Sequence, residues 1–248
     1  KKFPVGSDFI LGVNIGPNKD SNDRFNDYEI LSKNLSEFAD YLTINISSPN
    51  TPNLRDFHQT NNLKKVLISV KNGIAKSKSL DLQLPIFLKI APDISKNDLK
   101  QIIETANENN ISGLIISNTT VDRNKELQSD NLHETGGLSG IPLFNKSTNF
   151  LALASKIIKI KKYNLYLIAA GGVSDSKSAY AKILCGAHLV QLYSSMTFDG
   201  PLIAENILKG LLQLMNRDKI SSIKDIRGKA CNLEAAMKIA NNGFIDSL

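Results

Sequence analysis

The sequence contains no tryptophan, only two cysteines and no run of about 18 apolar residues, the minimum for a transmembrane helix. The opening residues, Lys1–Gly6, are too few and too polar for the apolar region of a signal peptide, so we expect none. Cys185 and Cys231 have no partner at ligand spacing, which argues against a disulfide framework or a CxxC metal site. A reducing compartment fits this cysteine usage best.

The charge balance is basic but mixed, with 30 Lys and Arg against 24 Asp and Glu. Because the two signs are interspersed and aromatic residues are few, we expect no nucleic-acid partner. His58, His133 and His188 are scattered without HxH or HExxH spacing, so we expect no metal site. The chain also contains no GxSxG elbow and no P-loop.

Short apolar runs alternate along the chain with longer stretches of helical periodicity. Most of the short runs are apolar throughout, which is typical of parallel strands buried on both faces. This alternation indicates βαβ units and a parallel sheet. The predicted strands are Phe9–Ile15, Tyr41–Ile46, Pro85–Ile90, Gly113–Ser117, Leu165–Ala170 and Leu189–Tyr193. The predicted helices are Asp27–Phe38, Asn61–Lys76, Lys96–Glu108 (after a near capping box at Ser95 and Asp98), Ser147–Lys161, Ser176–Leu184 and Ile203–Leu214.

Nearly every predicted strand ends in amides, hydroxyls or glycines. In an α/β barrel, the loops after the strands build the active site, so these clusters predict one shared site. Ordinary turns would explain any single cluster. They do not explain Lys89, which lies within an apolar strand and needs a partner or an anionic ligand there. The clusters are Asn14–Gly16, Asn45–Thr51, Lys89–Asp93, Asn118–Thr120, Gly171–Ser174 and Tyr193–Ser195.

Glycines gather in the second half of the chain. Gly136–Gly140 lies near the end of a long loop, about Asp122–Lys146, and loops of that length are usually binding elements, lids or disordered segments. Gly171 and Gly172 run from a strand towards a helix, where backbone N–H groups can face an anion. Together with the cation at Lys89 and the many amides, this pattern favours flavin mononucleotide (FMN) as the ligand.

Five segments resemble the signature segments of dihydroorotate dehydrogenases, in that family's order. They are Asn45–Thr51, Leu88–Asp93, Ser117–Thr120, Glu134–Gly140 and Leu189–Tyr193. Class 1 enzymes of the family carry a cysteine base in the loop after the second strand predicted here. This chain has Ser48 there, which resembles class 2, whose electron acceptor is a membrane quinone.

The resemblance implies a (β/α)8 TIM-barrel fold and oxidation of dihydroorotate to orotate through FMN, in pyrimidine biosynthesis. Ser48 would be the general base, with Ser47 as its competitor, and Lys89 would hold a positive charge beside the flavin. The implied substrate contacts are Asn45, Asn50, Asn118 and Thr119. The implied cofactor contacts are Asn14, Asn45, Lys89, Ser117, Gly140, Gly172, Tyr193 and Ser194.

The chain departs from the family pattern because about six βα units are visible where the barrel needs eight. Family members begin with a hydrophobic helical pair and two further strands, including a substrate lysine, which this chain does not show. We assign residues 1–230 to the flavin-binding barrel and 231–248 to a C-terminal tail of unknown role. The alternatives are a truncated, non-catalytic barrel that acts as a binding module, and a different FMN-barrel oxidoreductase.

The same resemblance sets the expected partners and location. Dihydroorotate, orotate and a quinone are the small-molecule partners. Contact with a membrane would be peripheral, through an N-terminal region outside this chain. The membrane would be the bacterial cytoplasmic membrane or the mitochondrial inner membrane.

Overall fold

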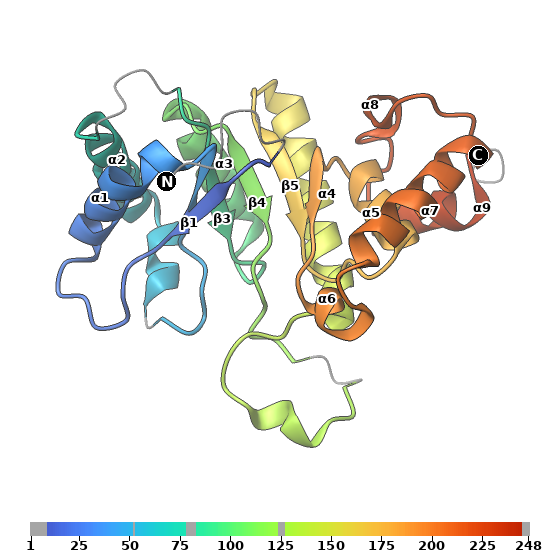
Figure 1. Ribbon diagram of the computed structural model, residues 1–248, viewed down its shortest axis with the longest axis horizontal. Coiled ribbons are helices and arrows are strands. Elements are labelled where there is room, and N and C mark those ends of the chain that lie inside the picture. Colours follow the sequence, from blue (N-terminus) through green and yellow to red (C-terminus); the bar gives the residue numbers. More distant parts are fainter. Residues whose placement is uncertain (1–8, 52, 78–82, 124–126, 245–248) are drawn as a thin grey trace. The chain divides into compact units, whose positions relative to one another are not determined.

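The computed structural model of the chain describes residues 9–51, 53–77, 83–123 and 127–244. It divides into two compact units. The N-terminal unit comprises Lys1–Ile90 and Ser95–Leu114, and the C-terminal unit comprises Ala91–Ile94 and Ile115–Leu248. The boundary falls within strand β4 (Gly113–Ile116), and the strand order of the sheet is β1-β2-β3-β4-β5-β6. Strands that alternate with helices along the chain confirm the predicted α/β class (Figure 1).

The N-terminal unit contains three parallel strands and three α-helices. The strands pair in chain order, with Ile44 opposite Ile15 on one side and opposite Leu88 on the other. These three side chains are almost fully buried. The strands are β1 (Gly12–Ile15), β2 (Tyr41–Asn45) and β3 (Ile86–Ile90). The helices are α1 (Arg24–Leu35), α2 (Thr60–Ala75) and α3 (Lys96–Glu108), with 3-10 turns η1 (Ser36–Phe38) and η2 (Leu54–His58).

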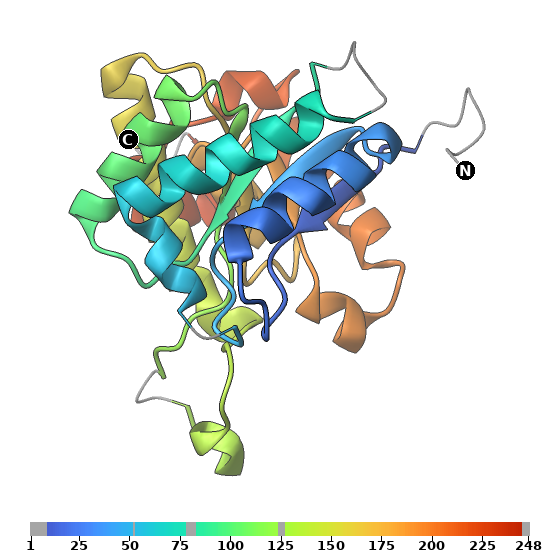
Figure 2. The ribbon, with the colours of Figure 1, turned by 90° about the vertical axis from the view of Figure 1, so that its left-hand side faces the viewer.

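Local signals fix where these helices begin and how closely they pack. The Asp23 carboxylate accepts hydrogen bonds from the first turn of α1, which therefore starts three residues before the predicted position. The predicted capping box at the start of α3 is confirmed, since Ser95 and Asp98 bond reciprocally. Helices α1 and α2 lie side by side (Figure 2). A Cβ atom on Gly73 would lie 2.0 Å from Ser32 Oγ, so this contact requires glycine.

The C-terminal unit contains two parallel strands, β5 (Tyr166–Ala170) and β6 (Leu189–Gln191), paired with Ala170 opposite Gln191. Helix α5 lies inside this unit, and each of its residues from Ser178 to Leu184 is buried. The helices are α4 (Phe144–Lys161), α5 (Ser176–Leu184), α6 (Ser194–Asp199), α7 (Ile203–Arg217), α8 (Ile223–Ile226) and α9 (Leu233–Asn242). The 3-10 turns are η3 (Asp130–His133) and η4 (Ile141–Leu143).

The tail that sequence patterns left without a role forms α9, which packs against α5 (Figure 1). Arg217, at the end of α7, donates hydrogen bonds of 2.9, 3.0 and 3.2 Å to the carbonyls of Ile239, Ala240 and Asn241. These carbonyls belong to the last turn of α9, and that of Ile239 also accepts from the Gly243 N–H at 2.8 Å. Because carbonyls in a last turn need partners from outside the helix, the guanidinium caps α9. The described part of the tail is therefore helical over Leu233–Asn242.

Other predicted boundaries also differ from the observed ones. Strand β6 ends at Gln191, and Tyr193 caps the start of α6. Helix α6 has only six residues, too few for a helical period to show in the sequence. Helix α4 begins at Phe144, before the predicted Ser147, because a 3-10 turn leads directly into it. Strand β1 begins at Gly12 and not at the predicted Phe9, and both Phe9 and Ile10 are exposed.

Candidate active site

The ends of the three strands in the N-terminal unit bring predicted site residues to one edge. Asn45, the last residue of β2, lies opposite Lys89 of β3 in the parallel register. Asn14 of β1 lies opposite Thr43, two residues before Asn45. Because the strands are parallel, their carboxyl ends lie at the same edge of the sheet. The unit therefore gathers Asn14, Asn45 and Lys89 as the sequence predicts, although their contacts with a ligand stay predictions.

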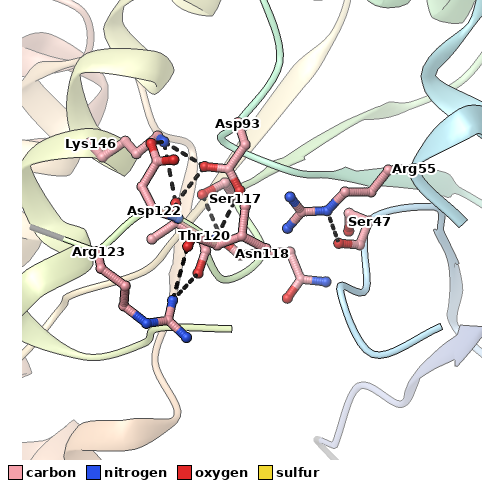
Figure 3. Close-up of polar contacts among 10 residues, drawn as sticks. Ser47, Arg55, Asp93, Ser117, Asn118, Thr120, Asp122, Arg123 and Lys146 are labelled. Carbon is pink, nitrogen blue, oxygen red and sulfur yellow. Dashed lines mark hydrogen bonds and ion pairs between the residues drawn. The ribbon is translucent and has the colours of Figure 1, made fainter. Parts of the chain in front are cut away.

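The loop after β2 begins with a buried hydrogen-bond network around Asn45. Tyr28 donates its hydroxyl to the Asn45 carbonyl at 2.8 Å. Ser47 is fully buried, and both its hydroxyl (3.0 Å) and its backbone N–H (3.2 Å) donate to Asn45 Oδ1. The Arg55 side chain reaches the Ser47 carbonyl at 3.4 Å (Figure 3). Ser47 therefore orients the Asn45 amide.

Ser48 differs from Ser47 in exposure and in hydrogen bonding. Its side chain is half-buried, and its Oγ accepts a hydrogen bond of 3.3 Å from the backbone N–H of Asn50. That contact uses a lone pair and leaves the hydroxyl proton available to another acceptor. Of the two serines, Ser48 is therefore the one with the exposure that a proton-transfer residue needs.

Lys89 is a cation inside the sheet of the N-terminal unit. Burial lowers the pKa of its ammonium group below the usual lysine value. No carboxylate forms an ion pair with it in the described part of the chain. A partly desolvated ammonium without a counter-charge is unfavourable, so an anionic or electron-rich ligand would stabilise this site.

In the C-terminal unit, local hydrogen bonds fix the residues after β4. The Ser117 hydroxyl donates to the Asn118 carbonyl at 2.9 Å, and its backbone N–H donates to Ala170 at 3.1 Å. The backbone N–H of Thr119 donates to Asn118 Oδ1 at 2.8 Å. The Asn118 amide oxygen is therefore held in one orientation. Its predicted role as a substrate contact stays a prediction.

A charged cluster beside these residues has no counterpart among the sequence predictions. Asp93 accepts hydrogen bonds from the Thr120 hydroxyl and, at 3.0 Å, from the backbone N–H of Val121. Lys146, from the first turn of α4, forms ion pairs with Asp93 at 2.5 Å and with Asp122 (Figure 3). The cluster ties the start of the long loop to α4. Its members are separated by up to 53 residues, so no local pattern could reveal it.

Arg123 joins the two ends of the long loop, and sequence reasoning missed it as well. Its guanidinium donates to the carbonyls of Thr120 (3.4 Å) and Val121 (3.2 Å) on the outgoing side. It also donates to those of Glu134 (3.1 Å) and Gly136 (3.0 Å) on the returning side. A backbone bridge between Thr120 and Leu138 lies at the same place. The described part of the loop projects away from the body of its own unit (Figure 2).

The residues predicted to hold a phosphate lie together in the C-terminal unit. A Cβ atom on Gly140 would lie 3.7 Å from Ser194 Cβ, and the Ser194 hydroxyl donates to that of Ser139 at 2.9 Å. A Cβ atom on Gly172 would lie 2.4 Å from Phe144 Cα, and Phe144 directly follows the 3-10 turn after Gly140. Tyr193, in contrast, is 86% exposed. The structure thus gathers Gly140, Gly172 and Ser194.

The turn after β5 has the properties of an anion site. Gly171 and Gly172 adopt positive φ angles of 98° and 78°, which turn successive N–H groups to one side. Gly172 and Val173 are buried, yet no hydrogen bond among the described residues uses their backbone N–H groups. Buried N–H groups are nearly always paired, so these two fit a phosphate oxygen. The residues present therefore fit the phosphate end of a flavin mononucleotide.

Comparison with known proteins gives one consistent result. The family model described as dihydroorotate dehydrogenase matches residues 4–215. The chain is 43% identical over 219 residues to a dihydroorotate dehydrogenase (quinone) of Bartonella tribocorum, which covers 88% of this chain and 60% of that protein. It is 42% identical over 235 residues to the protein of the same name from Rhizobium johnstonii, covering 93% and 63%.

Two solved structures of the Eimeria tenella enzyme, DHODH, have the same fold. The complex with ferulenol superposes with a TM-score of 0.82 at 35% identity, over 88% of this chain and 61% of that one. The ligand-free form superposes with a TM-score of 0.83 at 35% identity, over 89% and 64%. The chain therefore spans just over three fifths of the length of these relatives.

Proposed function

The chain belongs to the dihydroorotate dehydrogenase family, and from that premise we propose that the protein oxidises dihydroorotate to orotate. FMN would be its prosthetic group and a quinone its electron acceptor, in de novo pyrimidine biosynthesis. Relatives named as the quinone-dependent enzyme support the choice of acceptor. The family match argues against the alternative of a different FMN-barrel oxidoreductase. A non-catalytic binding module is the remaining alternative, and the activity test decides it.

The observation that carries the proposal is the arrangement at the end of β2. Asn45 and Lys89 are register partners on neighbouring strands, and the half-buried Ser48 follows three residues after Asn45. An amide, a cation and an accessible hydroxyl thus come from one edge of the sheet. This set can bind a polar ring, balance negative charge and accept a proton.

In the proposed reaction, Ser48 removes the proton from C5 of dihydroorotate. A serine hydroxyl is a weak base, so its own proton has to pass to a neighbouring hydroxyl or to water. The half-exposed position of Ser48 permits that transfer, and the buried Ser47 is already bonded to Asn45. Asn45, Asn50, Asn118 and Thr119 would hold the substrate by hydrogen bonds.

When bound, FMN supplies the acceptor for the hydride that leaves C6 of the substrate. Lys89 would place a fixed positive charge beside the ring system, where a preorganised charge stabilises developing negative charge. Asn14 and Ser117 would contact the flavin and its ribityl chain. Gly140, Gly172, Tyr193 and Ser194 would hold the phosphate end, as the paired glycines and unpaired N–H groups support.

A membrane quinone lies in the lipid bilayer, so an enzyme that reduces it has to reach the membrane surface. We therefore propose that the protein associates peripherally with a membrane. Among the helices that the structure describes, none combines the length and the apolar character needed to cross a bilayer. Sedimentation with quinone-containing vesicles, compared with quinone-free vesicles, would test this part.

The decisive experiment compares Ser48→Ala with Ser47→Ala in the full-length protein. The measurements are flavin absorbance of the purified protein and dihydroorotate-dependent reduction of a soluble quinone. We expect Ser48→Ala to keep its flavin and to lose about 10²–10⁴-fold in turnover at neutral pH, the usual effect of removing a general base. Ser47→Ala should mainly lower stability, because it removes a buried hydrogen bond.

Two other outcomes would contradict these assignments. Near-normal turnover in Ser48→Ala together with a large loss in Ser47→Ala would reverse the assignment of the base. A flavin-free wild type that does not oxidise dihydroorotate would favour the non-catalytic module.

A further inference from the structure

A second lysine, Lys182 of α5, is fully buried in the C-terminal unit. Its ammonium donates a 2.6 Å hydrogen bond to the Ser147 hydroxyl and lies 5.4 Å from the centre of the Phe144 ring. No carboxylate forms an ion pair with it anywhere in the described chain. A fully buried ammonium with one neutral acceptor and one aromatic ring lacks a counter-charge.

The hydrogen bond from Lys182 leads to the turn after β5. Ser147 Oγ, also fully buried, accepts from Lys182 and donates to the carbonyl of Gly171 (2.9 Å) or of Phe144 (3.1 Å). Gly171 immediately precedes Gly172, whose N–H group is unpaired within the described residues. The cation is therefore two hydrogen bonds away from the backbone of the turn that fits a phosphate.

The charges around Lys182 do not neutralise it. Burial lowers the pKa of Lys182 to about 7. Cys185, the C-cap residue of α5, has a smaller effect that raises this pKa. Burial in turn raises the pKa of the Cys185 thiol to about 12, so it is neutral near pH 7. From α4, Lys182 faces only the Ser147 hydroxyl and the Phe144 ring. Asp218, which follows α7, pairs instead with Tyr180 and Arg217.

We propose that Lys182 is a positioning residue that supplies the positive charge for a phosphate monoester bound at the Gly171–Val173 turn. It acts through Ser147, which fixes the turn, and through its own buried charge. The proposal rests on the proposed function in one respect, since FMN is the phosphate monoester that the function calls for. The N–H groups without a partner among the described residues and the buried ammonium without a described counter-charge are independent observations that point to the same anion.

A dependence on pH follows from this arrangement. Below about pH 7 the lysine is already charged, so a phosphate binds without proton uptake. Above that pH, binding must return a proton to Lys182, because the bound dianion raises the pKa of the ammonium. Affinity for FMN therefore falls as pH rises, by up to about tenfold per pH unit, until the pKa of the bound state is reached. The second ionisation of a phosphate monoester lies near pH 6 and does not produce this trend.

The test compares Lys182→Met with Lys156→Met in the full-length apoprotein. Methionine keeps the length of the buried side chain without its charge. Lys156 is an exposed lysine on α4 and controls for the loss of one positive charge. Affinities for FMN and for riboflavin, which lacks the phosphate, are measured between pH 6.5 and 9 by quenching of flavin fluorescence.

We expect Lys182→Met to bind FMN about tenfold more weakly than wild type at pH 6.5, with unchanged affinity for riboflavin. The pH trend of FMN binding should disappear in Lys182→Met and persist in Lys156→Met. Equal FMN affinities and equal pH trends in all three proteins would overturn the proposal. An equal loss of FMN and riboflavin affinity would also overturn it, because a purely structural role predicts that result.

Two further measurements separate this inference from the proposed function. If the wild type binds neither flavin, the choice of FMN is wrong, and inorganic phosphate becomes the probe. Thermal stabilisation of the wild type by phosphate, absent in Lys182→Met, would then support the anion site, and no stabilisation would contradict it. If Lys182→Met does not fold, calorimetry of the wild type at pH 8 in two buffers must show proton uptake with FMN or the proposal fails.

Discussion

The predicted site residues of the two units are of different kinds. In the N-terminal unit the contributing groups are side chains at strand ends, namely Asn45, Ser48 and Lys89. In the C-terminal unit, around Gly140, Gly172 and Ser194, they are mostly backbone groups in turns where a side chain would collide or strain the chain. Side chains can exchange protons and place charge, whereas backbone N–H groups can only bind. The first region is therefore suited to chemistry and the second to holding a ligand.

Each region also contains one lysine with no described carboxylate partner. Lys89 is half-buried within a strand, and Lys182 is fully buried in a helix. Burial lowers the pKa of both. If the division between chemistry and binding is correct, substitutions in the first region change turnover at constant flavin content. Substitutions in the second change flavin retention.

The largest effect that tests this division is expected from Lys89→Met in the N-terminal unit. Turnover should fall by about 10²–10³-fold, as when a preorganised electrostatic contact to the reacting group is removed. Flavin content, measured by absorbance of the purified protein, should stay near that of wild type. Lys100→Met, which changes an exposed lysine of α3, is the matched control. Loss of flavin with unchanged turnover per bound flavin would instead place Lys89 among the binding residues.

A smaller effect is expected from Gly172→Ala, and it concerns flavin retention and not turnover. The new methyl group would lie 2.4–2.6 Å from backbone and Cβ atoms of Phe144, at a φ of 78°. We expect thermal unfolding to show a loss of about 2–4 kcal/mol and the protein to release FMN. Gly200→Ala has a similar φ of 77° but no atom within 4 Å, so it measures the backbone strain alone. Equal losses in the two variants would show that Gly172 is not packed as described.

The smallest effect is expected from Arg123→Ala at the neck of the long loop. This change removes guanidinium contacts to four backbone carbonyls within one unit. We expect KM for dihydroorotate to rise roughly fivefold, equivalent to about 1 kcal/mol, with kcat and flavin content nearly unchanged. Arg123→Lys keeps the positive charge but loses the planar guanidinium group. Its KM should therefore lie between the values of the wild type and of Arg123→Ala. A change in kcat alone would indicate that Arg123 acts on the chemical step.

Local sequence patterns were enough to predict the alternation of strands and helices and the polar residues at strand ends. Both follow from local rules, because apolar runs bury on two faces and parallel strands end at one edge. Lys89 was recognisable because a lysine within an apolar strand is conspicuous. The family segments, such as Asn45–Thr51, predicted the ligand, which stays a prediction, and the match to the family model confirmed the family.

Which groups are buried, and what they contact, became visible once the packing of distant segments was known. Ser47 and Ser48 are adjacent and chemically identical, and their separation into a buried and an accessible serine depends on Tyr28 and Arg55 from other elements. Lys182 lies on a short helix that resembles any amphipathic surface helix until α4, α7 and α9 enclose it. Its contact to Ser147 joins residues 35 apart in the chain. Such contacts depend on how distant segments pack, and local periodicity does not encode them.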